Sequence, residues 1–121
     1  MSSEGPAKTV QAVLAARENL ALIGGWADGR VLEELRSDTL VRYAIERAFI
    51  ALAAAMRDIP QEVIEAHALP ATLVAGFRNA LAHTYDDILD ERVILTISDD
   101  LPRLDAQLAA ILRTLGHDAG D

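Results

Sequence analysis

Cysteine is absent from the 121 residues, which excludes disulfide frameworks, thiolate zinc sites and cysteine nucleophiles. Aromatic residues make up only 4% of the chain, so the core has to be filled mainly by Leu, Ile, Val and Ala. Long apolar runs are also missing. The longest, residues 48–56, lies between Arg47 and Arg57 and falls well short of the roughly 20 residues that a membrane-spanning helix needs. These absences predict a globular protein with an aliphatic core and no membrane partner.

Positive charge is scarce: Lys and Arg total 11 and Asp and Glu total 19, for a formal net charge of −8. A general binder of phosphate backbones normally carries the opposite sign, so any nucleic-acid role has to rest on a small local cationic site. The first six residues lack the basic start and apolar stretch of a secretory signal, and we expect a cytoplasmic protein. No repeat or linker divides the chain. We expect one domain over residues 1–121, with flexible ends at residues 1–6 and 117–121.

Apolar residues recur at helical spacing through most of the sequence. The first periodic run is expected to end at Gly24 and Gly25, and a short helical piece follows at residues 31–35. Ser37 or Asp38 then provides an N-cap for a long helix. The apolar stripe of that helix, in steps of three and four, consists of Val41, Ile45, Ala48, Phe49, Leu52 and Met56.

The second half of the chain follows the same pattern. Pro70 suits the first turn of a helix, and a last helix is expected from Asp99 or Asp100 to Gly116. Residues 93–97 are the ambiguous segment, because their β-branched run is compatible with a strand. A lone strand would have no partner in this chain, so we expect a helix there as well. The predicted fold class is an all-α bundle of about five helices.

Metal chemistry is not indicated. His67 and His117 are expected at the surface, and the sequence contains no His-x-x-x-His or Glu-x-x-His pair. The acidic residues between positions 86 and 100 form no calcium-loop pattern and are better explained as a solvated, helix-capping face. We therefore expect no metal and no cofactor.

Residues 78–85, with the sequence RNALAHTY, gather Arg78, Asn79, His83 and Tyr85 near the end of an amphipathic helix. Phosphodiester cleavage in RNA needs a base for the 2′-hydroxyl, an acid for the leaving 5′-oxygen and a cation for the charge that builds on phosphorus. Histidine, with an ordinary pKa of about 6.5, suits the proton transfers. Arginine offers a permanent charge and a planar fork that matches phosphate oxygens. This group of residues is the candidate site.

The spacing within this segment has a geometric consequence. Asn79 and His83 are four residues apart and share a helix face, whereas Arg78 points about 140° away from His83. A two-fold axis beside the helix would unite two copies in one cleft, which predicts a homodimer with its site at the interface. The alternative from the residues alone is that Arg78 pairs with nearby aspartates and His83 only caps a helix.

The segment 78–85 resembles the R-N-x-L-x-H-x-Y signature of the HepT-like toxins, within the HEPN superfamily of ribonucleases. The resemblance extends to the acidic residues 86–93 and upstream to residues 42–48, and it covers most of the chain from about residue 38 to 115. It departs from the family pattern at Leu89, where an acidic residue is frequent.

The resemblance implies a HEPN-like bundle and a metal-independent endoribonuclease toxin, with tRNA as one candidate substrate. By position, Arg78 and His83 match the catalytic pair and Asn79 the supporting polar residue. Tyr85 matches the tyrosine that a nucleotidyltransferase antitoxin (MntA-like) modifies with AMP. AMPylation there would add charge and bulk two residues from His83 and would repel RNA.

Two further questions stay open at the level of the sequence. Glu46 and Arg47 on the long helix are candidates to support the site, but Arg42 and Glu46 also form an ordinary i,i+4 pair. The second question is the function class. The rival to the toxin is a non-catalytic HEPN-type module that binds a nucleotide or a nucleotidyltransferase, and a third option is a structural helical dimer.

Overall fold

A computed structural model of the chain describes residues 4–70, 73, 76 and 99–117. Within these residues every regular element is a helix, and no strand occurs. Five helices are bounded in this part of the chain: α1 (Glu4–Ala27), α2 (Leu32–Ser37), α3 (Thr39–Arg57), α4 (Gln61–Ala66) and α7 (Leu101–Thr114). The all-α fold class predicted from the sequence is confirmed.

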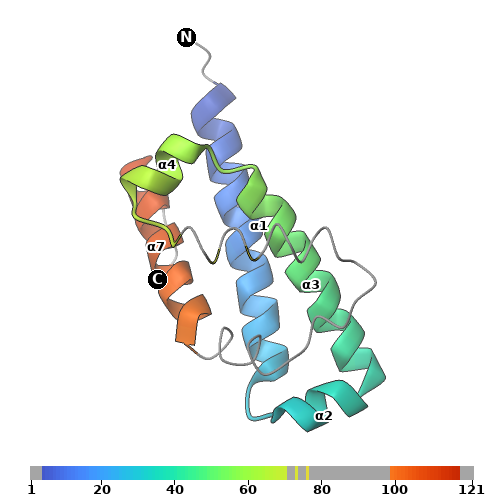
Figure 1. Cartoon of the computed structure of the whole chain (residues 1–121). Helices are drawn as coiled ribbons and strands as arrows, with labels where there is room; N and C mark the ends of the chain where they lie inside the picture. The colour runs from blue at the N-terminus through green and yellow to red at the C-terminus, as the bar shows by residue number, and fades with distance from the viewer. Residues whose placement is uncertain (1–3, 71–72, 74–75, 77–98, 118–121) are drawn as a thin grey trace.

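Helix α1 is the centre of the bundle. It packs against α3 along one side and α7 along the other, and α2 packs against α3 (Figure 1). The core is aliphatic, as the composition predicts, and Phe49 is the aromatic residue buried in the described part. Among the side chains most completely removed from solvent are Val13, Ile23, Leu35, Ile45, Leu52, Met56, Leu104, Leu108, Ile111 and Leu112.

Helix α3 begins where the sequence predicts. Asp38 is its N-cap, and the Asp38 carboxylate accepts a hydrogen bond from the backbone N–H of Val41 at 3.2 Å. The guanidinium of Arg30 donates to the other carboxylate oxygen at 3.4 Å. The Val41 N–H, together with Arg30, lowers the pKa of Asp38 below its ordinary value of 3.8. A side chain therefore satisfies one of the free N–H groups of the first turn.

The expected helix end at Gly24 and Gly25 is wrong. Helix α1 continues to Ala27, and the Asp28 N–H donates to the Gly24 carbonyl at 3.0 Å. Each glycine inside a helix costs about 1 kcal/mol, but the turn that contains them carries apolar residues into the core. Ile23 is fully buried and Trp26 packs against the core cluster. Their burial offsets the glycine cost, and the chain turns at Gly29 instead, with φ +72°.

Helix α7 ends as predicted. At its start Asp100 occupies the predicted N-cap position, but its side chain makes no capping hydrogen bond, and Pro102 lies in the first turn. At the other end Gly116 adopts φ +77°. Its N–H donates to the Arg113 carbonyl at 3.0 Å, and the His117 N–H donates to the Leu112 carbonyl at 2.8 Å. These two bonds form a Schellman turn, the common ending of helices that are followed by glycine.

Candidate functional site

The predicted site residues Arg78, Asn79, His83 and Tyr85 lie outside the described residues, and so does the ambiguous segment 93–97. The structure describes the frame that holds the two ends of this part of the chain. One end is the turn that follows α4, and the other is the start of α7. We refer to residues 77–98 as the signature segment.

The turn before the signature segment is tightly fixed. Helix α4 ends in a Schellman turn, in which the Ala68 N–H donates to the Glu65 carbonyl at 3.2 Å and the Leu69 N–H donates to the Ile64 carbonyl at 3.0 Å. Ala68 has φ +53° and is the only non-glycine residue of the described part with positive φ. Its carbonyl accepts a hydrogen bond from Nε2 of Gln107 at 3.2 Å. The turn is thereby attached to α7.

The residues that follow this turn remain attached to the bundle. Leu69 is buried, and Leu73, which is helical, packs against the core cluster. Gly76 is also helical and is exposed. The sequence expectation of a helix that begins near Pro70 is consistent with these described positions. Leu69 and Leu73 therefore anchor the stretch before the signature segment to the core.

The start of α7 is held to α1 by a partly buried ion pair. Nε of Arg17 lies 2.8 Å from Oδ1 of Asp105, and an Nη atom of the same guanidinium lies 3.3 Å from Oδ2. Such a two-point contact between a planar fork and a carboxylate fixes orientation as well as distance. Helix α7 is thus fixed to the central helix, and the turn after α4 is attached to α7.

A hollow of about 430 Å³ lies where the two ends of the frame meet. It is bordered by Ala68 and Pro70 on one side and by residues of α7 and its N-cap on the other: Asp100, Arg103, Ala106 and Gln107. Arg103 lies 3.5 Å from Asp100 across one helical turn. Sequence reasoning did not identify this hollow, because alanine and glutamine carry no signal that they border one.

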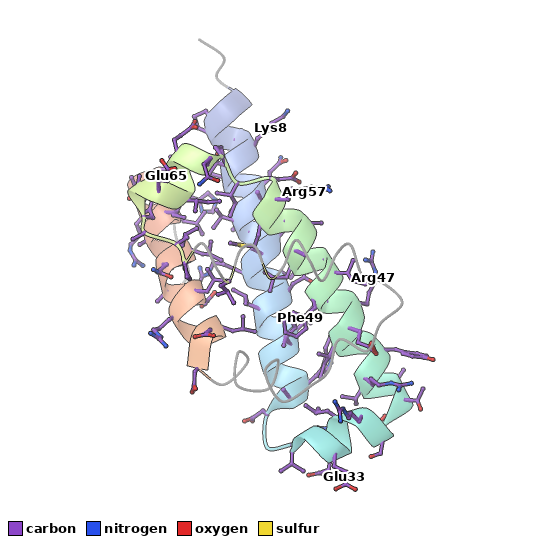
Figure 2. The ribbon with its side chains drawn as sticks, in the orientation of Figure 1. Lys8, Glu33, Arg47, Phe49, Arg57 and Glu65 are labelled. Atoms are coloured by element: carbon purple, nitrogen blue, oxygen red, sulfur yellow. The ribbon has the colours of Figure 1, made fainter. Side chains whose placement is uncertain are left out.

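The structure describes the α3 residues that the sequence suggests as possible supports of the site. Nε of Arg42 lies 3.7 Å from Oε1 of Glu46, and the Arg42 guanidinium lies over the Tyr43 ring at 5.1 Å from its centroid. The i,i+4 pair is therefore present. Arg47 projects from α3 and is exposed (Figure 2). A supporting role for Glu46 or Arg47 at the signature stays a prediction.

Within residues 4–70, 73, 76 and 99–117, no group of three or more His, Asp or Glu side chains is placed to hold a metal ion. No helix in the same part of the chain is long and apolar enough to cross a membrane.

The sequence model of the HepT-like family, described as Ribonuclease HepT-like, matches residues 16–111. The chain belongs to the HepT-like family. The comparison with curated proteins found no match, and neither did the comparison with solved structures.

Membership in this ribonuclease family supports the interpretation of the chain as a ribonuclease toxin. The HepT-like match includes α2, α3 and α4 completely and all of the signature segment. The described helices are therefore the scaffold of a HepT-like protein. They place Ala68 and Asp100 on either side of the segment in which the predicted catalytic residues lie.

Proposed function

We propose that this HepT-like protein is the toxin of a toxin–antitoxin pair and a metal-independent endoribonuclease, with tRNA as a candidate substrate. One observation carries the proposal: the Arg78 to Tyr85 signature lies inside a family match that covers residues 16–111. The signature supplies an imidazole, a guanidinium and an amide, the groups that RNA cleavage without a metal requires.

In this proposal His83 performs the proton transfers. It accepts the proton of the 2′-hydroxyl as that oxygen attacks phosphorus, and a protonated imidazole gives a proton to the departing 5′-oxygen. Arg78 stabilises the charge that accumulates on the pentavalent phosphorus, and Asn79 orients the phosphate or the imidazole. Because Arg78 and His83 diverge by about 140° on one helix, the proposal includes a homodimer whose two copies together complete each site.

The proposed control of the toxin is modification of Tyr85. A nucleotidyltransferase antitoxin, MntA-like in type, would transfer the AMP group of ATP to the phenol oxygen, which loses its proton as pyrophosphate departs. The added phosphate is negatively charged and lies two residues from His83, so it would repel the RNA backbone and obstruct the cleft.

The deciding experiment is cleavage of total tRNA in EDTA by the purified dimer, after the mass of the Tyr85 peptide has shown that it is unmodified. Arg78→Ala and His83→Ala, shown by circular dichroism and light scattering to be folded and dimeric, should both lose activity by at least 100-fold. Cleavage that survives in both variants would contradict the mechanism and indicate a contaminant.

A mixture of the two inactive variants tests the shared site. If Arg78 of one chain works with His83 of the other, exchange of subunits restores one complete site per mixed dimer, and part of the activity returns. A monomer with full activity would contradict the shared site.

The non-catalytic module remains the second candidate, and the divergence of Arg78 and His83 favours it if the chain does not pair. Absence of cleavage by unmodified, dimeric protein would decide for that module.

A further inference from the structure

The cations of the described chain fall into two groups. Four arginines form ion pairs with carboxylates, from Arg17 with Asp105 at 2.8 Å to Arg42 with Glu46 at 3.7 Å. Arg36 and Arg113 also have interaction partners. The second group is Lys8, Arg47 and Arg57. Each is exposed, and none forms an ion pair or hydrogen bond with the side chains that the structure describes.

The three cations of the second group lie along one side of the molecule (Figure 2). Lys8 comes from α1 and Arg47 and Arg57 from α3, and Figure 2 shows all three on the side of the α1–α3 pair that faces away from α7. Arg47 and Arg57 are ten residues apart on one helix, a distance of about 15 Å along its axis. We call these three residues the cationic edge.

One residue of the cationic edge, Lys8, lines a groove. This hollow of about 480 Å³ lies between α1 and the end of α3, and it is lined by Lys8 and Gln11 of α1 and by Asp58, the C-cap of α3 that follows Arg57. Its other lining residues are three alanines, Ala12, Ala15 and Ala55. Because the alanine side chains are small, the groove stays open, and an RNA strand that follows the cationic edge can lie against α1 and α3.

Helix stability does not account for Arg47. It lies in the middle of α3, and the residues three and four positions away from it are Tyr43, Ala44, Ile50 and Ala51, none of which is acidic. The other two cations are in places that suit a helix. Lys8 follows Glu4 by four residues in α1, and Arg57 lies in the last turn of α3.

We propose that the cationic edge binds the phosphate backbone of the RNA substrate, outside the signature segment; the identity of the ligand as substrate rests on the proposed function. The argument is charge complementarity. In a chain of net charge −8, three exposed cations on one side that form no ion pair with the described side chains are a local positive site, which an RNA-binding acidic protein requires. A separation of about 15 Å along α3 lets the edge contact more than one phosphate of the same RNA.

The test uses full-length His83→Ala protein, so that tRNA binding is measured without cleavage. Fluorescence anisotropy of labelled tRNA is recorded between 50 and 200 mM salt for this protein and for the same protein with Lys8→Gln, Arg47→Gln and Arg57→Gln. The triple variant should bind about 10- to 100-fold more weakly at low salt. Three lost contacts at about 0.7 each should make the slope of log K against log salt about 2 units shallower.

A matched control removes three charges elsewhere. Arg30→Gln, Arg36→Gln and Arg113→Gln give the same net charge from exposed positions off the edge. Binding by this control should be within about threefold of the parent. If both triple variants lose affinity equally, the effect is one of net charge and the edge is not the site, which overturns the proposal.

Asp58→Asn removes a negative charge, so its expected effect on tRNA binding is the opposite of that of the edge variant. It removes the carboxylate that borders the groove beside Arg57, so tRNA binding should become severalfold tighter. Unchanged tRNA binding by both Asp58→Asn and the edge variant would overturn the proposal. It would also be overturned if the edge variant still bound tRNA normally and lost only the binding of a nucleotidyltransferase.

Failure of this proposal is distinguishable from failure of the proposed function. If the wild type cleaves tRNA and the edge variant binds tRNA as tightly as its parent, the ribonuclease proposal stands and the proposal for the cationic edge is wrong. If binding depends on the edge but the wild type never cleaves, the edge proposal stands and the ribonuclease proposal is wrong.

Discussion

Helices α4 and α7 end in the same hydrogen-bonded turn with different residues in its left-handed position. Ala68 holds this position after α4, with φ +53°, and Gly116 holds it after α7, with φ +77°. Glycine adopts this conformation without a steric penalty, whereas an L-residue with a Cβ atom pays about 1–2 kcal/mol. The turn that leads to the signature segment is thus strained, and the turn near the end of the chain is not.

The surroundings explain why the strained turn persists. Leu69, directly after Ala68, is 5% exposed, and the Ala68 carbonyl accepts the hydrogen bond from Gln107 of α7. At the end of α7, Leu115 is 39% exposed, and a Cβ on Gly116 would meet no atom within 4 Å. A residue can be held in an unfavourable conformation when neighbouring contacts determine its position. Tertiary packing therefore shapes the first turn, and local residue preference shapes the second.

The largest expected effect comes from breaking the packing that holds the first turn. Leu69→Ala should lower the free energy of unfolding by about 2–4 kcal/mol, because it removes a buried side chain and leaves a cavity. Urea unfolding followed by the fluorescence of Trp26, the single tryptophan, measures the change. Leu115→Ala is the matched control and should cost less than about 1 kcal/mol, since that side chain is already partly in solvent. Equal losses for the two variants would show that both turns depend on packing alike.

A pair of reciprocal substitutions sharpens the comparison. Ala68→Gly should stabilise the protein by about 1 kcal/mol through relief of strain, and Gly116→Ala should destabilise it by about the same amount. Both positions are exposed, so neither change disturbs the core. The same urea titration measures both. A loss of stability in Ala68→Gly would show that the turn is relaxed and that the flexibility glycine gives to the unfolded chain dominates.

These turns also mark how far sequence could predict the fold. Asp100 and Gly116 carry the ordinary signals of helix ends, and both were placed from sequence. Ala68 carries no such signal, because alanine is a helix former and its left-handed conformation comes from contacts with α7. Gly24 and Gly25 carry a false signal, since burial of Ile23 and packing of Trp26 keep the helix going through them.

The candidate site was predictable in its chemistry and only partly in its setting. The signature was recognisable because Arg78, Asn79, His83 and Tyr85 are close in sequence, and the HepT-like match spans them. The hollow beside Ala68 and Arg103 and the cationic edge were not predictable. Each is assembled from residues of separate helices, and their relative positions follow from packing of the bundle.

The smallest expected effect concerns a helix end that a side chain fixes, in contrast to the two turns fixed by backbone conformation. The pKa of Asp38 is lowered in the folded protein by the Val41 N–H and by Arg30. The folded state therefore binds the proton less readily than the unfolded state, and this contribution to stability is present above the ordinary pKa of 3.8 and lost as pH falls through the folded value.

Asp38→Asn should remove that dependence, because an amide oxygen still accepts from Val41 but carries no charge to titrate. Urea unfolding between pH 5 and pH 2.5 should show a constant difference between wild type and Asp38→Asn above about pH 4, and the two should converge as the pH falls below 3.8 through the lower pKa of the folded state. The Ala68→Gly and Gly116→Ala effects, which arise from backbone conformation, should stay constant over the same range. A pH-independent difference between Asp38→Asn and wild type would mean that the cap acts through hydrogen bonding alone and that charge contributes nothing at this helix start.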